Sequence, residues 1–452
     1  MLKRIIVSFL VILAVGFTFV SCDSDKGKAV PIETSSEKET PLTLENYGSS
    51  DMKVTIQFTN LTAGDSKLKY SIDGGEKQDV TLSTSFDITV PAGKTISFYD
   101  DRSSTTGAST LYTINCDKEC YVYGNVMSLI NSTDFKDLTS LENHAHAFAK
   151  LFFKNTNIMD HPKKALVLPA TKLADSCYAR MFEDCTGITK APELPATTMA
   201  KGCYASMFSG CSGLTAAPKL PAEILEDNCY YLMFQNCTNL KKAPELPAKK
   251  MKDSCYFAMF INCSSLTSAP ALPAEELANY CYNNMFRLCT GLTEAPDLPA
   301  NILATNCYMG MFWNCTGLTT APELRATYLA SGCYSYMFAG CTSLTTAPTE
   351  LPAEISAPDC YSNMFQDCTA LTTSPKILAD SLSSRCCVDM FSGCTQLSSV
   401  TCLARSSTSS DSTLGWLSGV ASTGTFTKSA AASFWPTNSS NGIPTGWTTE
   451  DL

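Results

Sequence analysis

A unit of about 26 residues recurs along most of this chain and constrains its fold more than any other feature. Each copy reads close to CYxxMFxxCTxLTxAPxLPA. Its first cysteine recurs at one fixed spacing from Cys177 to Cys333, and two slightly longer steps lead to Cys360 and Cys387. One such unit is too short to bury its own apolar side, so successive units must stack. The sequence therefore predicts a solenoid, a kind of fold that binds more often than it catalyses.

Within each copy, apolar residues stand four apart, as Cys203 and Met207 do, and Tyr204 and Phe208. This spacing predicts a short helical turn with Met, Phe and Cys inside and Tyr packed between coils or over the convex side. The Leu and Ala positions that follow predict a short strand that stacks on its neighbours as a parallel sheet. The strand must end or bulge at the recurring proline, such as Pro218, because proline has no N–H for the ladder.

Three further segments surround the regular repeats. β-branched and aromatic runs separated by turn residues predict an antiparallel β-sandwich-like domain over residues 41–130. The solenoid is expected over 131–403, since Leu151–Ile158 aligns on Met181–Ile188, with Ala147 and Asn155 at the two cysteine positions. Residues 404–452 are expected to cover the open end of the stack. A carbohydrate platform is the alternative role for the three tryptophans of that segment, Trp416, Trp435 and Trp447.

The N-terminus indicates export. Residues 1–21 have a basic start, an apolar run and a small residue at the end, so they predict a cleaved signal peptide. The run FVSC before Cys22 resembles the lipobox of bacterial lipoproteins, which implies cleavage before Cys22, acylation of its thiol and a stable membrane anchor. A plain secretory signal is the alternative. Residues 22–40 are polar and charged and predict a disordered tether. The acidic residues behind Cys22 resemble a surface-export signal, so an outer-membrane, cell-surface location is expected.

The repeat itself resembles a known family. CYxxMFxxCTxLTxAP, with LPA between copies, is similar to the BspA-like leucine-rich repeats of Bacteroidetes surface lipoproteins, and the likeness covers roughly residues 110 to 450. The likeness implies a cell-surface protein with a role in adhesion or host interaction, without naming a ligand. From the residue patterns given above, the expected fold is β-rich with short helical turns, and the β-sandwich-like domain precedes a right-handed leucine-rich-repeat solenoid. The second cysteine of each unit departs from the family, which has an aliphatic residue there.

Two interpretations of the repeat cysteines remain open. The leading copy has lost both cysteines together, which favours a disulfide within each unit, whereas two separate columns of buried thiols are the alternative. Cys116 and Cys120 flank DKE and form either a short bridge or a free pair. The candidate bridges within units are Cys177 with Cys185, Cys203 with Cys211, Cys229 with Cys237, Cys255 with Cys263, Cys281 with Cys289, Cys307 with Cys315, Cys333 with Cys341, Cys360 with Cys368, and Cys387 with Cys394.

Motifs for other functions are missing from the sequence. The net charge is −10 and no basic cluster occurs, so nucleic acid is not an expected partner. The cysteine spacing does not fit zinc, and no GxSxG, HExxH or phosphate loop accompanies His144, His146 and His161. We therefore expect no enzyme activity, no cofactor and no metal site.

The expected binding face is the concave sheet, at the exposed positions after the strand leucine. It is rich in threonine and nearly without aromatic residues, which favours a host or neighbouring-cell protein as partner over a glycan. A glycan-capture lipoprotein of a nutrient uptake system is the alternative. The candidate residues are Thr189, Lys190, Lys241, Lys242, Thr293, Glu294, Thr319, Thr320, Thr345 and Thr346.

Overall fold

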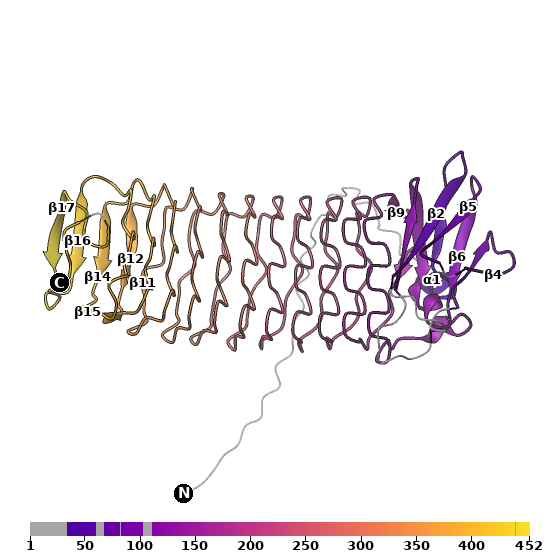
Figure 1. The fold of residues 1–452 in the computed structure, drawn as a ribbon, viewed down its shortest axis with the longest axis horizontal. Coiled ribbons are helices and arrows are strands. Elements are labelled where there is room, and N and C mark those ends of the chain that lie inside the picture. Colours follow the sequence, from indigo (N-terminus) through magenta and orange to yellow (C-terminus); the bar gives the residue numbers. More distant parts are fainter. Residues whose placement is uncertain (1–33, 60–66, 82, 103–110, 439) are drawn as a thin grey trace, which may run out of the picture. The chain divides into compact units, whose positions relative to one another are not determined.

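The computed structural model describes residues 34–59, 67–81, 83–102, 111–438 and 440–452 (Figure 1). The expected signal peptide, Cys22 and most of the expected tether lie outside these residues. The tether prediction is wrong at its end, because Thr34–Glu39 form helix α1. The Asn125 side chain donates a hydrogen bond to the carbonyl of Lys38 (3.1 Å), which ties this helix to the β domain.

Two packed sheets form the expected sandwich. In the first, β2 pairs antiparallel with β5 and β7, and its residues alternate between buried and exposed, with Val54 and Ile56 in the core. In the second, the order is β10-β8-β1-β6-β3-β4, and β9 also pairs with β8. The elements are β1 (Thr43–Glu45), β2 (Met52–Thr59), β3 (Lys69–Ile72), β4 (Gln78–Asp79), β5 (Ser85–Val90), β6 (Thr95–Tyr99), β7 (Leu111–Cys116), β8 (Cys120–Asn125), and the 3-10 helices η1 (Val126–Leu129) and η2 (Phe135–Asp137).

The second sheet continues into the solenoid. Strands β9 (Ile158–Asp160) and β10 (Leu166–Val167) belong to the first coil and pair in parallel with β8. The β domain therefore covers the first coil with hydrogen-bonded strands, so the apolar side of that coil does not face solvent. Figure 1 shows the coils stacked beyond β9 as a long series of similar loops.

The Cys–Tyr–Met–Phe segment of each coil is a ribbon of successive turns, so the prediction of a helical turn is wrong. Its amide groups alternate between two kinds of partner. The N–H groups of Ala179 and Met181 bond three residues back, whereas those of Tyr178 and Phe182 bond across to the next coil, to Cys203 and Met207. Half of the backbone donors therefore hold coils together, which a helix could not do because it satisfies its own donors.

The turns of this ribbon place every fourth residue at positive φ. In the first regular coil these residues are Ser176 (54°), Arg180 (58°) and Asp184 (60°). Positive φ at the third residue of a turn is typical of type II turns and favours Gly, Asn or Asp. The position before the second cysteine follows this preference in every regular coil except one: Asp184, Gly210, Asn236, Asn262, Leu288, Asn314, Gly340, Asp367 and Gly393.

The apolar side chains form continuous columns inside the stack, as the sequence predicts. Phe rings stack from Phe152 to Phe391, with centroid separations such as 5.5 Å between Phe182 and Phe208. A tyrosine column runs beside them from Tyr178 to Tyr361. These side chains and the Met and Cys columns are buried. The stack therefore gains most of its stability from contacts between neighbouring coils.

The opposite side of the coils is less regular than the predicted parallel sheet. From Lys190 to Thr346 the coils meet there through isolated bridges, such as Glu294 with Thr320 and Thr320 with Thr346. The recurring Ala-Pro step explains this, because each proline removes a ladder donor. Full strands begin only toward the C-terminus, where β14, β16 and β17 contain no proline. The remaining strands are β11 (Glu350–Leu351), β12 (Thr373–Ile377), β13 (Ser381–Leu382), β14 (Ser399–Cys402), β15 (Ser406–Ser407), β16 (Gly424–Lys428) and β17 (Trp447–Asp451).

The structure corrects the register of the last repeat. The Tyr361 N–H bonds to the carbonyl of Cys386, as Tyr334 does to Cys360, so Cys386 occupies the first cysteine position. Cys387 takes the place of the tyrosine. Only the step from Cys333 to Cys360 is therefore longer than the others, and the step from Cys360 to Cys386 returns to the regular spacing.

Candidate binding surfaces

The predicted binding face is exposed along the stack. We call it the bridge face: the two residues after the buried leucine of each coil, some of which, such as Glu294, Thr320 and Thr346, form isolated bridges. All ten candidate residues are exposed. Backbone bonds such as Thr345 N–H to Thr319 carbonyl (3.0 Å) keep successive copies in register. Its C-terminal half presents a regular row of threonine hydroxyl groups, with Thr319 and Thr320 on one coil and Thr345 and Thr346 on the next.

At the first coil of the bridge face, the exposed residues already bind another part of the chain. The Asp160 carboxylate accepts hydrogen bonds from the Thr189 N–H (2.7 Å), the Thr189 hydroxyl (2.7 Å) and the Lys190 N–H (2.8 Å). The polar backbone of this coil therefore has intramolecular partners. Thr189 and Lys190 are less available to a ligand than the later copies.

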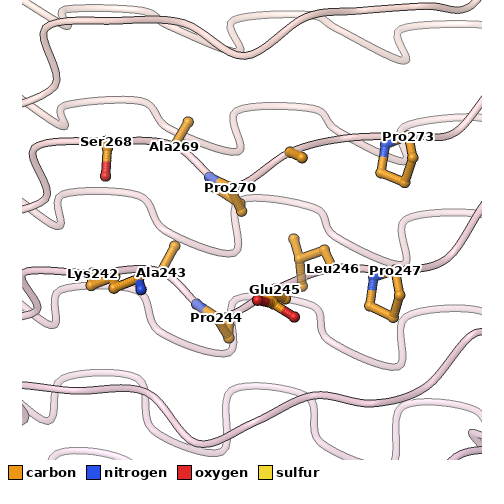
Figure 2. A pocket seen from close by; sticks show the side chains of 11 residues that line it. Lys242, Ala243, Pro244, Glu245, Leu246, Pro247, Ser268, Ala269, Pro270 and Pro273 are labelled. Atoms are coloured by element: carbon orange, nitrogen blue, oxygen red, sulfur yellow. The ribbon is translucent and has the colours of Figure 1, made fainter. Parts of the chain in front are cut away.

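An open groove lies beside the bridge face between two successive coils. Figure 2 shows its lining, with Pro270 above Pro244 and Pro273 above Pro247 in repeating positions. The groove holds about 320 Å³ and includes Lys242 at one end. The recurring prolines explain this groove, because proline has no N–H group and the two coils therefore lack backbone hydrogen bonds at these positions. The groove is shallow and its lining is mainly apolar.

A run of exposed apolar side chains forms a second surface that sequence reasoning missed. Ile302, Tyr328 and Ile355 lie at the same position of three successive coils and are 64, 65 and 77% exposed. We call these three residues the apolar ridge. Ile302 and Tyr328 are joined by a backbone bridge, so the side chains stand side by side. The sequence contains a signal for this surface, because the equivalent position of the repeat is apolar in successive coils only at these three residues.

Acidic residues border the apolar ridge. Glu275 lies one coil before it and Glu354 lies next to Ile355, and both are exposed. Glu276 is paired with Lys250 at 2.9 Å, so its charge is largely balanced. Among the described residues no ion pair involves Glu275 or Glu354, which leaves negative charge on both ends of the ridge.

Half-buried aromatic residues gather on the turn ribbon, where sequence reasoning placed no site. Tyr231 stacks on Phe257 at 4.9 Å, and Trp313 stacks on Tyr336 at 5.0 Å. The guanidinium of Arg287 lies 4.0 Å from the Trp313 ring centre. Each of these rings has one face covered by its stacking partner, and Arg287 lies over the ring of Trp313 as well. A sugar that stacks on a free ring face finds little such surface here.

The C-terminal tryptophans lie inward. Trp416 and Trp447 are buried, and their indole N–H groups bond to the carbonyls of Gly442 (3.0 Å) and Ala421 (2.8 Å). Trp435 stacks on Trp416 at 5.2 Å. Trp447 begins β17, and Trp416 and Trp435 contact Phe426 of β16, so the three rings pack against the end of the parallel sheet and do not form an exposed platform for carbohydrate.

The repeat cysteines are free thiols, so the expected bridges within units are absent from the described coils. The physical reason is that each second cysteine has another partner. The Cys185 thiol donates to the carbonyl of Phe152 (3.0 Å), and the same bond recurs in the later coils, as from Cys211 to Phe182. In the leading coil Asn155 makes the equivalent bond, from its amide to the carbonyl of Ile114 (3.1 Å).

Electrostatics also shows that the thiols form two separate columns. Burial raises the pKa of Cys203 well above its usual value, and the thiol of Cys177 in the preceding coil adds to this effect. For Cys211 the corresponding neighbours are Cys237 and Cys185. The thiols that affect Cys203 and Cys211 thus belong to their own columns in adjacent coils. Such buried neutral thiols are poor nucleophiles.

Metal-binding clusters and membrane-spanning helices are absent from the described part of the chain. No group of three or more His, Cys, Asp or Glu side chains there is placed to hold a metal ion. No helix among those residues is both long and apolar enough to cross a bilayer. His161 lies 3.7 Å from Glu45, and burial lowers its pKa, but it faces tyrosine rings at the domain junction.

Comparisons with known proteins add little to this geometry. No family model matches the chain, and no curated protein matches it. Among solved structures, a leucine-rich repeat protein from Bacteroides ovatus ATCC 8483 is similar over 58% of this chain and 78% of its own, with 16% identity and a TM-score of 0.26. A likeness at this level does not establish the fold, which is instead given by the coil geometry. The chain is β-rich, with two N-terminal sheets and a solenoid whose coils follow the period of the sequence repeat.

Proposed function

We propose that this protein is a non-enzymatic lipoprotein of the outer-membrane surface that uses its solenoid to bind a partner protein in adhesion. The apolar ridge carries the binding part of this proposal. Three large apolar side chains exposed side by side are uncommon on a protein surface without a partner. The resemblance to BspA-like proteins and the lipobox before Cys22 support the location.

The chemistry of the ridge favours a protein over a glycan. Ile302 and Ile355 are aliphatic and offer no ring face to a sugar, whereas protein interfaces bury such side chains around an aromatic anchor. Tyr328 lies between them and is the expected anchor. Because Glu275 and Glu354 border the ridge, the partner surface should be apolar with basic residues at its edges.

Binding by the full chain displayed on cells tests this proposal. The displayed protein is screened against immobilised matrix and neighbouring-cell proteins and, in parallel, against a glycan array. Tyr328→Glu should weaken protein binding by about thirtyfold, the loss typical of an interface hot spot. Ser343→Glu is the matched control, since it adds the same charge to an exposed site that belongs to neither the ridge nor the bridge face, and it should change binding less than about twofold. Equal losses in both variants, or glycan binding that survives Tyr328→Glu, would contradict the assignment.

The anchor is tested separately. Cys22→Ala should release the protein from the membrane fraction, because the acylated cysteine is the proposed attachment. Retention in the membrane fraction after this change would refute the lipoprotein part and leave the binding part standing.

A further inference from the structure

Two thiols touch each other where the β domain meets the first coil. Cys116 ends β7 and Cys120 begins β8, and their Sγ atoms lie 3.2 Å apart. The intervening turn, 117–119, brings the two strands of different sheets together at this point. No covalent bond joins the sulfurs, yet they are close enough to form one after a small movement.

The two thiols differ in access. Cys116 lines an open depression of about 470 Å³ together with Lys53, Asn115, Phe153 and Lys154. Cys116 is 7% exposed, whereas Cys120 has no exposed surface. Cys116 is therefore the residue of the pair that a small molecule in the depression meets first, and Cys120 is the thiol placed to attack it from the interior.

Hydrogen bonds also distinguish the two sulfurs. The Cys116 thiol contacts Cys120 and the Asn155 side-chain oxygen (3.3 Å). Its pKa is lowered, mainly by the hydrogen bond from Cys120, while burial acts in the opposite direction. The pKa of Cys120 is raised, first by that same hydrogen bond and then by burial. The accessible thiol is thus the better nucleophile of the pair.

We propose that Cys116 and Cys120 form a reversible dithiol–disulfide site, in which Cys116 reacts first with a small-molecule disulfide and Cys120 completes the exchange. In the first step the Cys116 thiolate attacks one sulfur of the small disulfide, and the other half leaves as a thiolate. In the second step the deprotonated Cys120 sulfur attacks Cys116 and displaces the bound half, also as a thiolate. The chain loses two hydrogens and two electrons, and the small disulfide is reduced to two thiols.

The site is linked to the first coil of the solenoid. The Asn157 amide donates to the carbonyl of Cys116 (2.8 Å), and the Cys120 N–H donates to the carbonyl of Asn157 (3.0 Å). Oxidation removes the S–H hydrogen that Cys116 offers to Asn155. The Asn155 oxygen keeps the N–H of Asn157 (3.2 Å), so the junction retains its fold in both states.

A second pair of neighbouring thiols provides an internal control. The Sγ atoms of Cys386 and Cys387 are 3.4 Å apart, but both residues are fully buried within the stack. The distance between the two sulfurs is similar in the two pairs, whereas only the first pair includes a residue with exposed surface. Among the cysteines that the structure describes, we therefore expect reaction only at Cys116 and Cys120 under native conditions.

Peptide mapping of the reduced full chain tests the proposal. The native protein is incubated with oxidised glutathione, quenched in acid, alkylated in denaturant and digested for mass spectrometry. We expect the wild-type peptide of 116–120 to lose two hydrogens about tenfold faster than that of Cys386 and Cys387, since access and thiolate fraction set the rate. Equal rates for the two pairs, or a Cys116 thiol that stays reduced while unfolded protein reacts, would overturn the proposal.

Two variants separate the roles of the sulfurs. Cys120→Ser should stop at a mixed disulfide of glutathione on Cys116, and Cys116→Ser should leave Cys120 reduced. Glutathionylation of Cys120 before Cys116 would refute the assigned order. The time course of the wild-type protein also shows which of the two cysteines reacts first with glutathione. The order of reaction can therefore be tested even if a variant fails to fold.

Discussion

Leu288 is the residue whose replacement best distinguishes the turn ribbon from a helix. Its φ is 63°, at the position where the other coils carry Gly, Asn or Asp. A left-handed conformation costs a residue such as leucine about 1–2 kcal/mol, and asparagine tolerates it better. In the preceding coils the Asn262 amide donates to the Asn236 oxygen at 3.0 Å. Leu288→Asn would extend this ladder toward Asn314.

The expected change in stability follows from these terms. Relief of backbone strain contributes about 1–2 kcal/mol. Loss of apolar contact by the half-buried leucine removes about 1 kcal/mol, and one partly exposed amide bond restores about 0.5 kcal/mol. Leu288→Asn should therefore stabilise its coil by about 1 kcal/mol, which slows local hydrogen exchange about fivefold. Exchange measured by mass spectrometry on peptides from residues 281–314 gives this value directly.

Ile261 provides the matched control. It is also a half-buried aliphatic residue of the ribbon, but its φ lies outside the left-handed region. Ile261→Asn gains no relief of strain and should speed exchange in its own coil. If Leu288→Asn destabilises its coil as much as Ile261→Asn does, the ribbon explanation of the four-residue pattern is refuted, since that is the outcome a helix predicts.

Three further predictions concern the interior of the stack. Phe260→Ala should cost about 3–5 kcal/mol in urea unfolding and more than Phe391→Ala, because Phe260 has stacked rings on both sides; equal costs would contradict the ladder. Cys263→Ser should be less destabilising than Cys263→Ala in the same assay, since the hydroxyl can still bond to the Phe234 carbonyl, 3.1 Å from the thiol; the reverse order would argue against this bond. Burial raises the pKa of Cys289 from 9.0 to about 12, and it also raises the pKa of most other repeat cysteines and of the column tyrosines, such as Tyr282. The unfolded chain releases these protons at a lower pH than the folded chain does. The free energy of unfolding should therefore keep its full value below about pH 9 and fall steeply as the pH rises toward 12. A decrease at alkaline pH as shallow as that of a disulfide-bonded chain would count against free thiols.

The repeat period was sufficient to predict the stacked coils and their inward columns, but not the backbone that carries them. Cys203 and Met207, four residues apart, fit a helix and a ribbon of turns equally well. The deciding signal is the recurrence of Gly, Asn and Asp at every fourth residue, which left-handed positions favour. It is diluted by residues such as Leu232 and Tyr336, which adopt positive φ against their preference.

Features that depend on contacts between distant segments were beyond the sequence. The docking of the β domain rests on parallel pairing of β8 with β9 and β10, which no local pattern encodes. The joint loss of both cysteines in the leading copy suggested a bridge. In the structure, Asn155 replaces one thiol as a hydrogen-bond donor, and Ala147 fills the other place as a small apolar residue. The apolar ridge lies outside the positions after the strand leucine, and its apolar character is confined to three consecutive coils, so the repeat pattern does not reveal it.

The state of the repeat cysteines tests the account of the stack most directly. The purified protein is alkylated without reductant, once in its native state and once in denaturant, and the modified peptides are mapped. The structure predicts that the described cysteines other than Cys116 and Cys120 are protected in the native state and all alkylated after denaturation. Peptides joined through pairs such as Cys229 and Cys237 would contradict the free-thiol columns and the hydrogen bonds between coils that they make.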